Sequence, residues 1–408
     1  MSRARQWWKG AWFPALLAAL ILTLYLPALR FGLIWDDPRY YQKVSEQATL
    51  GQIFTSPQPP TYQFYRPMAV LYAHLFLAPN GVVNAPLAHA LQIAAHLLVS
   101  LSLAPVLRAF RFDAIHARLA ALCFAIYPLS YYGVAWQQNQ QPWVVLCLLL
   151  ALLAAHRFCE SKSAVFLGLS LAAYATALLF QEGAAPFVFL FFWLAWECRE
   201  MQARPAWWPL LHAGLVALYT LIWLTRPIQR GVTGQGFQPM VLAYFMQGLV
   251  FPVARSLSGW LADWPLATLF ALFTGVWLLL SFGLWKWGAR RAVLLGGAWA
   301  AVGLLPLWAG LSWDYAQSGA RLFYPAAVGL AALWGGWMAW AFTAPGRRRR
   351  IAGAITLVAV VGVSLHGWWQ FQRLFQVGTQ HLAHAAGELS ASPNRHLLFV
   401  NFPDRIEI

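Results

Sequence analysis

The sequence predicts an all-α polytopic membrane protein, and three observations support this fold class. First, 60% of the 408 residues are hydrophobic and only 10% are charged, a composition far outside the range of soluble domains. Second, the apolar residues form runs that are long enough to cross a bilayer as helices. Third, the basic residues behind the net charge of +15 gather in short segments between those runs. Such a pattern follows the positive-inside rule, so the charge does not indicate nucleic-acid binding.

The apolar runs define the predicted helices. A hydrocarbon core of about 30 Å needs roughly 17 to 25 apolar helical residues. On this measure we expect eleven helices, at residues 12–29, 84–107, 119–135, 142–156, 164–180, 184–197, 207–225, 265–285, 292–309, 322–342 and 351–369. The first run follows Arg3, Arg5 and Lys9 and lacks a convincing signal-peptidase site, so we expect it to be a retained helix.

The basic residues also predict the orientation. With a cytoplasmic N-terminus, most of the 28 basic residues fall in short inner segments, ending with the run Arg347–Arg350. Residues 30–83 and 226–264 then form long outer loops with interfacial helices. Residues 1–369 form one transmembrane domain, and residues 370–408 form a short extracytoplasmic tail. The compact chain without a repeat domain favours the bacterial inner (plasma) membrane.

Two adjacent carboxylates begin the first outer loop, in the stretch "FGLIWDDPRYY" from Phe31 to Tyr41. Asp37 precedes Pro38 and could be the N-cap of a helix with proline at its first position. Asp36 is not needed for a cap, and a spare carboxylate beside a membrane is costly. Asp36 is therefore the better candidate for a general base.

Five segments together resemble the GT-C superfamily of integral-membrane glycosyltransferases, especially the protein O-mannosyltransferase branch and its relatives with tetratricopeptide repeats. In chain order they are "LIWDDPRYY", "FYRPMAVL", "CFAIYPLSYYGVAW", "LLFQEGAAPFVFLFFWLAW" and "ARLFYPAAVGLAALW", between residues 31 and 335. The ordered set is more specific than any single segment. The chain departs from these relatives at Gln181, where they carry Lys, and at Ala320, where they carry Glu. It also lacks the His and Glu of their third-helix segment and any repeat domain.

The resemblance implies a function. A sugar carried on a polyprenyl phosphate would pass, with inversion, to an acceptor hydroxyl outside the cytoplasm, on a protein or a glycan. The catalytic carboxylates that it implies are Asp36, Asp37 and Glu182. Two cations would hold the donor phosphate, Arg321 and Arg66, because a guanidinium suits phosphate geometry. Three aromatic residues would line the substrate cavity, namely Tyr65, Tyr324 and Trp136.

The predicted sugar transfer requires no cofactor, although the aspartate pair could hold a divalent cation. His89 and His96 share one helical face but have no carboxylate beside them, so we assign no metal site and expect them to be packed or interfacial.

Simpler roles remain open for the other candidate residues. Glu182 could belong to a polar turn, Arg321 could anchor a helix end at headgroup level, and Arg66 could form a salt bridge within a loop. A transporter or flippase of lipid-linked sugars is disfavoured, because the acidic residues gather at one face and not at midplane. A non-catalytic scaffold stays open because several residues of the resembled family are missing.

Overall fold

The computed structural model describes residues 12–34, 37–46, 49–55, 64–78, 80–199, 207–225, 238–250, 264–310, 320–343 and 346–391. Within these residues the regular secondary structure is helical, apart from an isolated bridge between Leu77 and Val83. Six of the described helices are long and apolar enough to cross a membrane, or seven if one bent pair counts as a single span. The all-α membrane fold is confirmed, whereas the expected count of eleven spanning helices is not.

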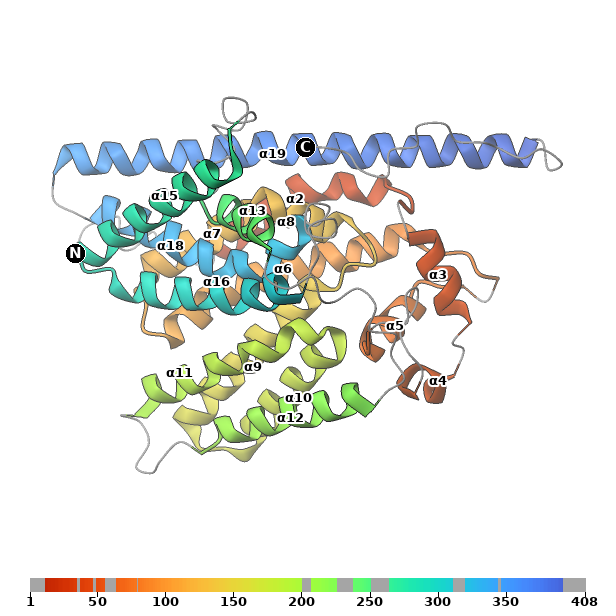
Figure 1. Cartoon of the computed structure of the whole chain (residues 1–408), viewed down its shortest axis with the longest axis horizontal. Helices are drawn as coiled ribbons and strands as arrows, with labels where there is room; N and C mark the ends of the chain where they lie inside the picture. Colours follow the sequence, from red (N-terminus) through yellow and green to blue (C-terminus); the bar gives the residue numbers. More distant parts are fainter. Residues whose placement is uncertain are drawn as a thin grey trace.

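Every predicted apolar run nevertheless forms a helix. In chain order these helices are α2 (Trp12–Tyr25) with η1 (Leu26–Arg30), α6 (Ala85–Ala109), α7 (Ala114–Ile126), α8 (Pro128–Ala135), α9 (Gln141–Ser161), α10 (Ala164–Phe180), α11 (Val188–Cys198), α12 (Pro209–Thr225), α15 (Leu266–Lys286), α16 (Arg290–Gly310), α18 (Phe323–Thr343) and α19 (Arg347–Ala391). The helix η4 (Ala320–Leu322) precedes α18. They form a bundle, and most of their helix axes run roughly along the horizontal of Figure 1.

Short helices lie in the two segments that the sequence predicts as outer loops. Residues 30–83 contain α3 (Asp37–Ser45), α4 (Leu50–Thr55) and α5 (Pro67–His74), which lie together at the right end of the bundle in Figure 1. Residues 226–264 contain α13 (Pro239–Leu249). Tyr244 and Phe245 of α13 pack on Phe323 at the start of α18, with ring centroids 5.3 and 5.5 Å away. Each predicted outer loop therefore holds short helices that pack on the bundle.

Prolines divide two helices that the apolar runs predicted as continuous. The run at 119–135 is two helices, α7 and α8, bent by 57° at Pro128. The run at 184–197 begins as a 3₁₀ helix, η2 (Glu182–Phe187), which contains Pro186, and becomes α-helical only at Val188. Proline lacks an N–H and collides with the preceding helical turn, so it bends or ends an α-helix.

The last helix continues beyond the predicted boundary at residue 369. Helix α19 is 45 residues long, or about 67 Å at 1.5 Å per residue, and crosses the whole bundle along the top of Figure 1. Its second half packs on the first outer segment: Phe375 stacks on Phe31, and the N–H of Gly32 donates to the hydroxyl of Thr379 at 3.2 Å. Residues 370–391 therefore continue α19, which packs on the residues before α3. The predicted extracytoplasmic tail at 370–408 stays a prediction, and its residues 392–408 lie outside the described part of the chain.

An ion cluster joins three of the predicted inner segments at the opposite end. Arg111 lies 3.3 Å and Arg291 3.5 Å from Oε2 of Glu197, and Nη1 of Arg291 donates to the carbonyl of Arg111 at 3.2 Å. The residues after α6, the last turn of α11 and the first turn of α16 therefore lie close together.

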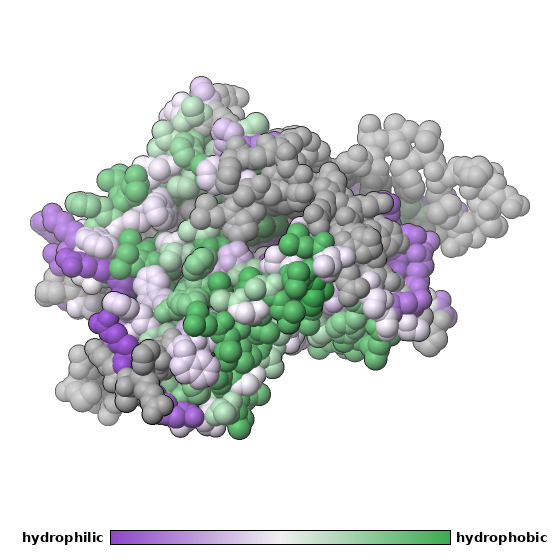
Figure 2. Space-filling view, turned by 60° about the horizontal axis from the view of Figure 1, so that its bottom comes forward, coloured by the Kyte–Doolittle hydropathy of each residue, from purple (hydrophilic) through white to green (hydrophobic). Residues whose placement is uncertain are grey.

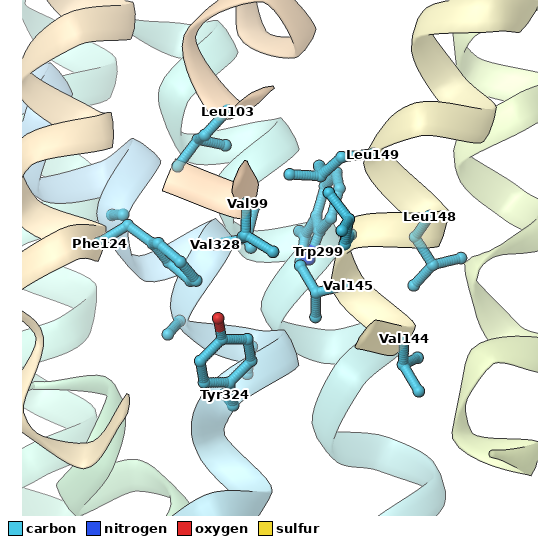
Figure 3. Close-up of a cluster of buried hydrophobic side chains, with 14 of the residues drawn as sticks. Val99, Leu103, Phe124, Val144, Val145, Leu148, Leu149, Trp299, Tyr324 and Val328 are labelled. Atoms are coloured by element: carbon cyan, nitrogen blue, oxygen red, sulfur yellow. The ribbon is translucent and has the colours of Figure 1, made fainter. Parts of the chain in front are cut away.

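Helix α18 lies at the centre of the core. Its side chains are nearly all buried, and a Cβ added to Gly335 would lie only 2.6 Å from the backbone nitrogen of Ala120 in α7. Figure 3 shows Tyr324 and Val328 of α18 beside residues of α6, α7, α9 and α16. The outer surface is also apolar: Figure 2 shows hydrophobic side chains across the middle of one face and hydrophilic ones toward its two ends. This distribution fits a chain embedded in a bilayer.

Candidate active site

The aspartate pair marks the start of α3. Asp36 lies outside the described residues, whereas Asp37 is the first residue of the helix and is fully buried. The N–H of Ile34 donates to Oδ2 of Asp37 at 3.1 Å. This bond ties the carboxylate to the chain before the helix, and the backbone N–H of Asp37 bonds to the carbonyl of Ile34 at 3.0 Å. Asp37 therefore closes the turn that leads into α3.

Tyr40 connects α3, which begins at Asp37, with α5. Its hydroxyl donates to the carbonyl of Ala69 in α5 at 3.3 Å, which fixes α3 against α5. Burial raises the pKa of Tyr40, the nearby charge of Arg66 lowers it, and that of Asp37 raises it. The hydroxyl is thus a neutral donor that lies within the electrostatic reach of both charges.

Arg66 and Glu182, which are 116 residues apart in the chain, form a two-pronged ion pair. Nε of Arg66 donates to Oε2 of Glu182 at 2.8 Å, and Nη2 donates to Oε1. The guanidinium also lies over the ring of Phe64, 3.9 Å from its centroid. The structure therefore brings together two predicted site residues in a salt bridge that joins the first predicted outer loop to η2.

The pair controls the protonation of Glu182. Burial raises the pKa of this carboxyl, but the charge and hydrogen bonds of Arg66 lower it further, so the net pKa lies below its usual value. Glu182 is consequently ionised at neutral pH. A carboxylate held in this way is a weak proton acceptor, so its placement suits an electrostatic role around Arg66 more than general-base chemistry.

Tyr65, the residue before Arg66, is held by two hydrogen bonds to helices. It is buried, its hydroxyl donates to the carbonyl of Phe54 at 3.2 Å, and its own carbonyl accepts the hydroxyl of Tyr219 in α12 at 2.9 Å. The residue before Arg66 is thereby fixed to α4 and to α12. In this structure Tyr65 positions the Arg66 backbone.

Arg321 contacts a different aromatic residue. Its guanidinium carbon lies 4.0 Å from the ring centroid of Trp136, at the end of α8, which places a cation on an aromatic face. Arg321 belongs to η4, which leads into α18. Two of the predicted site residues therefore meet directly, and the contact orients the guanidinium.

Tyr324 lies in the core, and its predicted place in the lining of a substrate cavity stays a prediction. It is fully buried, and its hydroxyl lies 2.8 Å from Nδ1 of His96. Nε2 of His96 faces the carbonyl of Ala125 at 3.3 Å and must donate to it, so Nδ1 accepts the tyrosine proton. Figure 3 shows this hydroxyl pointing into the apolar cluster. The hydrogen bond and the surrounding packing hold the Tyr324 side chain in the core.

The sequence reasoning missed a cluster of buried amides beside Trp136. Nε2 of Gln92 in α6 donates to the carbonyls of Gln137, at 3.3 Å, and Asn139, and Nε2 of Gln137 lies 2.9 Å from Nε2 of His89. All four side chains are buried. They hold the α8–α9 connection, and with it Trp136 under Arg321. The sequence feature that could have predicted this cluster is the run "WQQNQQPW", in which polar amides lie between two apolar helices.

Among the described residues no group of three or more His, Cys, Asp or Glu side chains could hold a metal ion. Asp36 lies outside the described residues, so a divalent cation at the aspartate pair stays a prediction.

Comparisons with known proteins identify the fold. No protein-family model and no curated protein matches the sequence. Among solved structures, the chain is similar to ArnT from Cupriavidus metallidurans bound to undecaprenyl phosphate, with a TM-score of 0.53 and 13% identity over 96% of this chain and 83% of ArnT. Apo ArnT gives a TM-score of 0.50 and 16% identity over 96% and 80% of the two chains.

The apo oligosaccharyltransferase of Archaeoglobus fulgidus gives a TM-score of 0.50 and 15% identity over 89% of this chain. The chain spans 56%, a little over half, of that enzyme's length. The fold is therefore of the GT-C type, as the sequence resemblance predicted. The narrower resemblance to the protein O-mannosyltransferase branch stays a prediction.

Proposed function

We propose that this protein is a glycosyltransferase that moves a sugar from a polyprenyl-phosphate carrier to an acceptor hydroxyl outside the cytoplasm. The observation that carries the proposal is the likeness over 96% of the chain to a structure that holds undecaprenyl phosphate. The charged pair Arg66–Glu182 at the end of the bundle that bears the outer helices supports it. The acceptor would be a protein or a glycan, and the membrane the bacterial inner membrane with a cytoplasmic N-terminus.

The proposed reaction needs a base, a cation and a lipid donor. The acceptor oxygen attacks the anomeric carbon and gives its proton to a carboxylate, while the bond from that carbon to the phosphate oxygen breaks with inversion. The leaving polyprenyl phosphate carries the released electron pair as negative charge, which guanidinium groups stabilise. We assign the base to Asp36 or Asp37, and the phosphate contact to Arg321.

Arg66 has a second role in this proposal. Its ion pair with Glu182 is bidentate, so the guanidinium is held in one orientation before the donor arrives. A preorganised cation avoids the cost of ordering a long side chain during binding. In this proposal Arg66 donates hydrogen bonds to the donor phosphate from this fixed orientation, while Glu182 offsets its net charge.

A direct assay separates the proposal from its alternatives. Membranes containing the protein are incubated one by one with radiolabelled polyprenyl-phosphate sugars, and transfer to protein and to glycan fractions is counted, with and without a chelator of divalent cations. We expect release of polyprenyl phosphate together with labelled acceptor. Movement of intact labelled lipid between leaflets without transfer would instead identify a flippase. Binding without transfer or movement would identify a scaffold.

A further inference from the structure

Two connections between helices lie side by side at the end of the bundle opposite α3. One turn joins α15 to α16 through Gly288, with φ of +90°, and the other leads into α19 through Gly346, with φ of +118°. The indole of Trp287 in the first turn stacks on Trp340 of α18, with centroids 3.9 Å apart and planes within 9°. Trp337 packs against both indoles at 5.1 and 5.5 Å. The tryptophan stack holds the two turns next to each other.

Both turns carry exposed positive charge. Lys286 and Arg290 flank the first turn, and the run Arg347–Arg350 begins α19, with all of these side chains exposed. The sequence contains no acidic residue from 265 to 310 or from 321 to 387. None of the ion pairs of the described residues involves these six cations. Four consecutive arginines repel one another, so the run favours an external anion.

The charges lie at the edge of a lipid-facing surface. Helices α15 and α19 expose large apolar side chains, among them Leu279 at 72% and Val358 at 71%. At the basic end, Arg349 lies over Trp340 and Arg290 over Trp285, each 5.4 Å from the ring centroid. Tryptophan beside arginine at a helix end is the pattern of the bilayer interface, where phosphate headgroups lie.

We propose that this basic-aromatic surface, formed by residues 285–290 and 346–350 with Trp337 and Trp340, binds the phosphate headgroups of anionic phospholipids. Charge complementarity selects the ligand: six cations without carboxylate partners face the depth at which lipid phosphates lie. The stacked indoles add a rigid wall beside them. The inference does not depend on the proposed glycosyl transfer, because the surface lies at the other end of the bundle.

Lipid binding to the purified full chain tests the proposal. Native mass spectrometry is used to count bound lipid in detergent with added phosphatidylglycerol or phosphatidylcholine. We expect preferential retention of phosphatidylglycerol. Replacing Arg347–Arg350 together by Gln should weaken it at least tenfold, since each arginine near an anionic surface contributes about fivefold. Replacing the same four residues by Lys keeps the charge and the membrane orientation, and should retain most of the binding.

The control removes two basic residues from another helix end, with Arg157→Gln near the end of α9 and Lys162→Gln just after it. That variant should bind phosphatidylglycerol like the unmodified protein. Equal retention of the two lipids, or undiminished binding by the four-glutamine variant, would overturn the proposal. So would displacement of phosphatidylglycerol by an equal concentration of inorganic phosphate, which would identify a site for a free anion.

Discussion

Glu182→Gln removes the charge that holds Arg66 while keeping nearly the same shape. The amide oxygen can still accept one hydrogen bond, but the bidentate contact with Nε and Nη2 is lost. Arg66 is then left without its carboxylate in a partly buried place, since its side chain is only 17% exposed and that of Glu182 34%. The variant should therefore lose stability and the fixed orientation of the guanidinium.

The size of the loss follows from the burial of the pair. Exposed ion pairs contribute about 0–1 kcal/mol, whereas breaking a fully buried pair costs about 3–5 kcal/mol. Because the pair is partly exposed, its contribution to stability lies between these two values. Screening by solvent brings that contribution toward the lower value. We expect a coupling free energy of about 1–2 kcal/mol between Arg66 and Glu182. The exposed pair Lys43–Glu46 should show at most about 0.5 kcal/mol.

A double-mutant cycle measures this coupling. Arg66→Gln, Glu182→Gln and the double variant are compared by reversible unfolding in mixed micelles, with Lys43→Gln and Glu46→Gln as the matched cycle. Sugar transfer is assayed on the same samples. A modest loss of activity with weaker donor binding would agree with a supporting role for Glu182. A coupling no larger than that of the control pair would refute the reasoning from burial.

The same pair predicts a pH dependence. The pKa of Glu182 in the folded protein lies below its usual value of 4.5, so its stabilising contribution is complete above that pH. The contribution falls as the pH drops through the folded-state pKa, where the carboxylate takes up a proton. The unmodified protein should therefore lose more stability than Glu182→Gln between about pH 5 and pH 3. Parallel pH profiles of the two proteins would contradict the assignment.

Three further predictions concern the catalytic pair, the donor phosphate and the topology. Asp36→Asn should bind donor but lose about 100- to 10,000-fold in transfer rate, and Asp37→Asn should lose less; equal, mild losses in single-turnover assays would exclude a base at this pair. Arg321→Lys should weaken donor binding because the planar fork is lost, whereas unchanged affinity in Arg321→Ala would return it to an anchoring role. Single cysteines after His381 should react with impermeant thiol reagents in intact cells; labelling only after permeabilisation would reverse the orientation.

The helical content could be read from the sequence because it depends on local composition. Apolar runs in lipid must satisfy their backbone hydrogen bonds internally, so each run folds as a helix wherever its neighbours lie. The helix breaks were also encoded locally, at Pro128 and Pro186, but the apolar pattern around them concealed the breaks. The end of α19 was harder to predict, since residues 370–391 are mixed in character. That helix is stabilised beyond the apolar run by packing of Phe375 on Phe31.

The candidate site was only partly readable from the sequence. Resemblance identified Arg66 and Glu182 as separate candidates, and only the folded chain showed that they bind each other. A motif says nothing about the direction of a side chain, so only the structure showed that Tyr324 is buried in the core. The amide cluster around Gln92 was missed because its partners lie 45 and 47 residues away in another segment.

By itself the sequence determined that this chain is a helical membrane protein with its basic residues gathered between apolar runs, because hydropathy and charge act on each segment separately. Only the tertiary structure decided which charges meet and which stay unpaired. It joined Arg66 to Glu182 and placed the guanidinium of Arg321 over the ring of Trp136. It also left the run Arg347–Arg350 beside a tryptophan stack, with no carboxylate of the described residues in contact. The physical reason is that the energy of a charge depends on its neighbours within a few ångströms, and those neighbours come from distant parts of the chain.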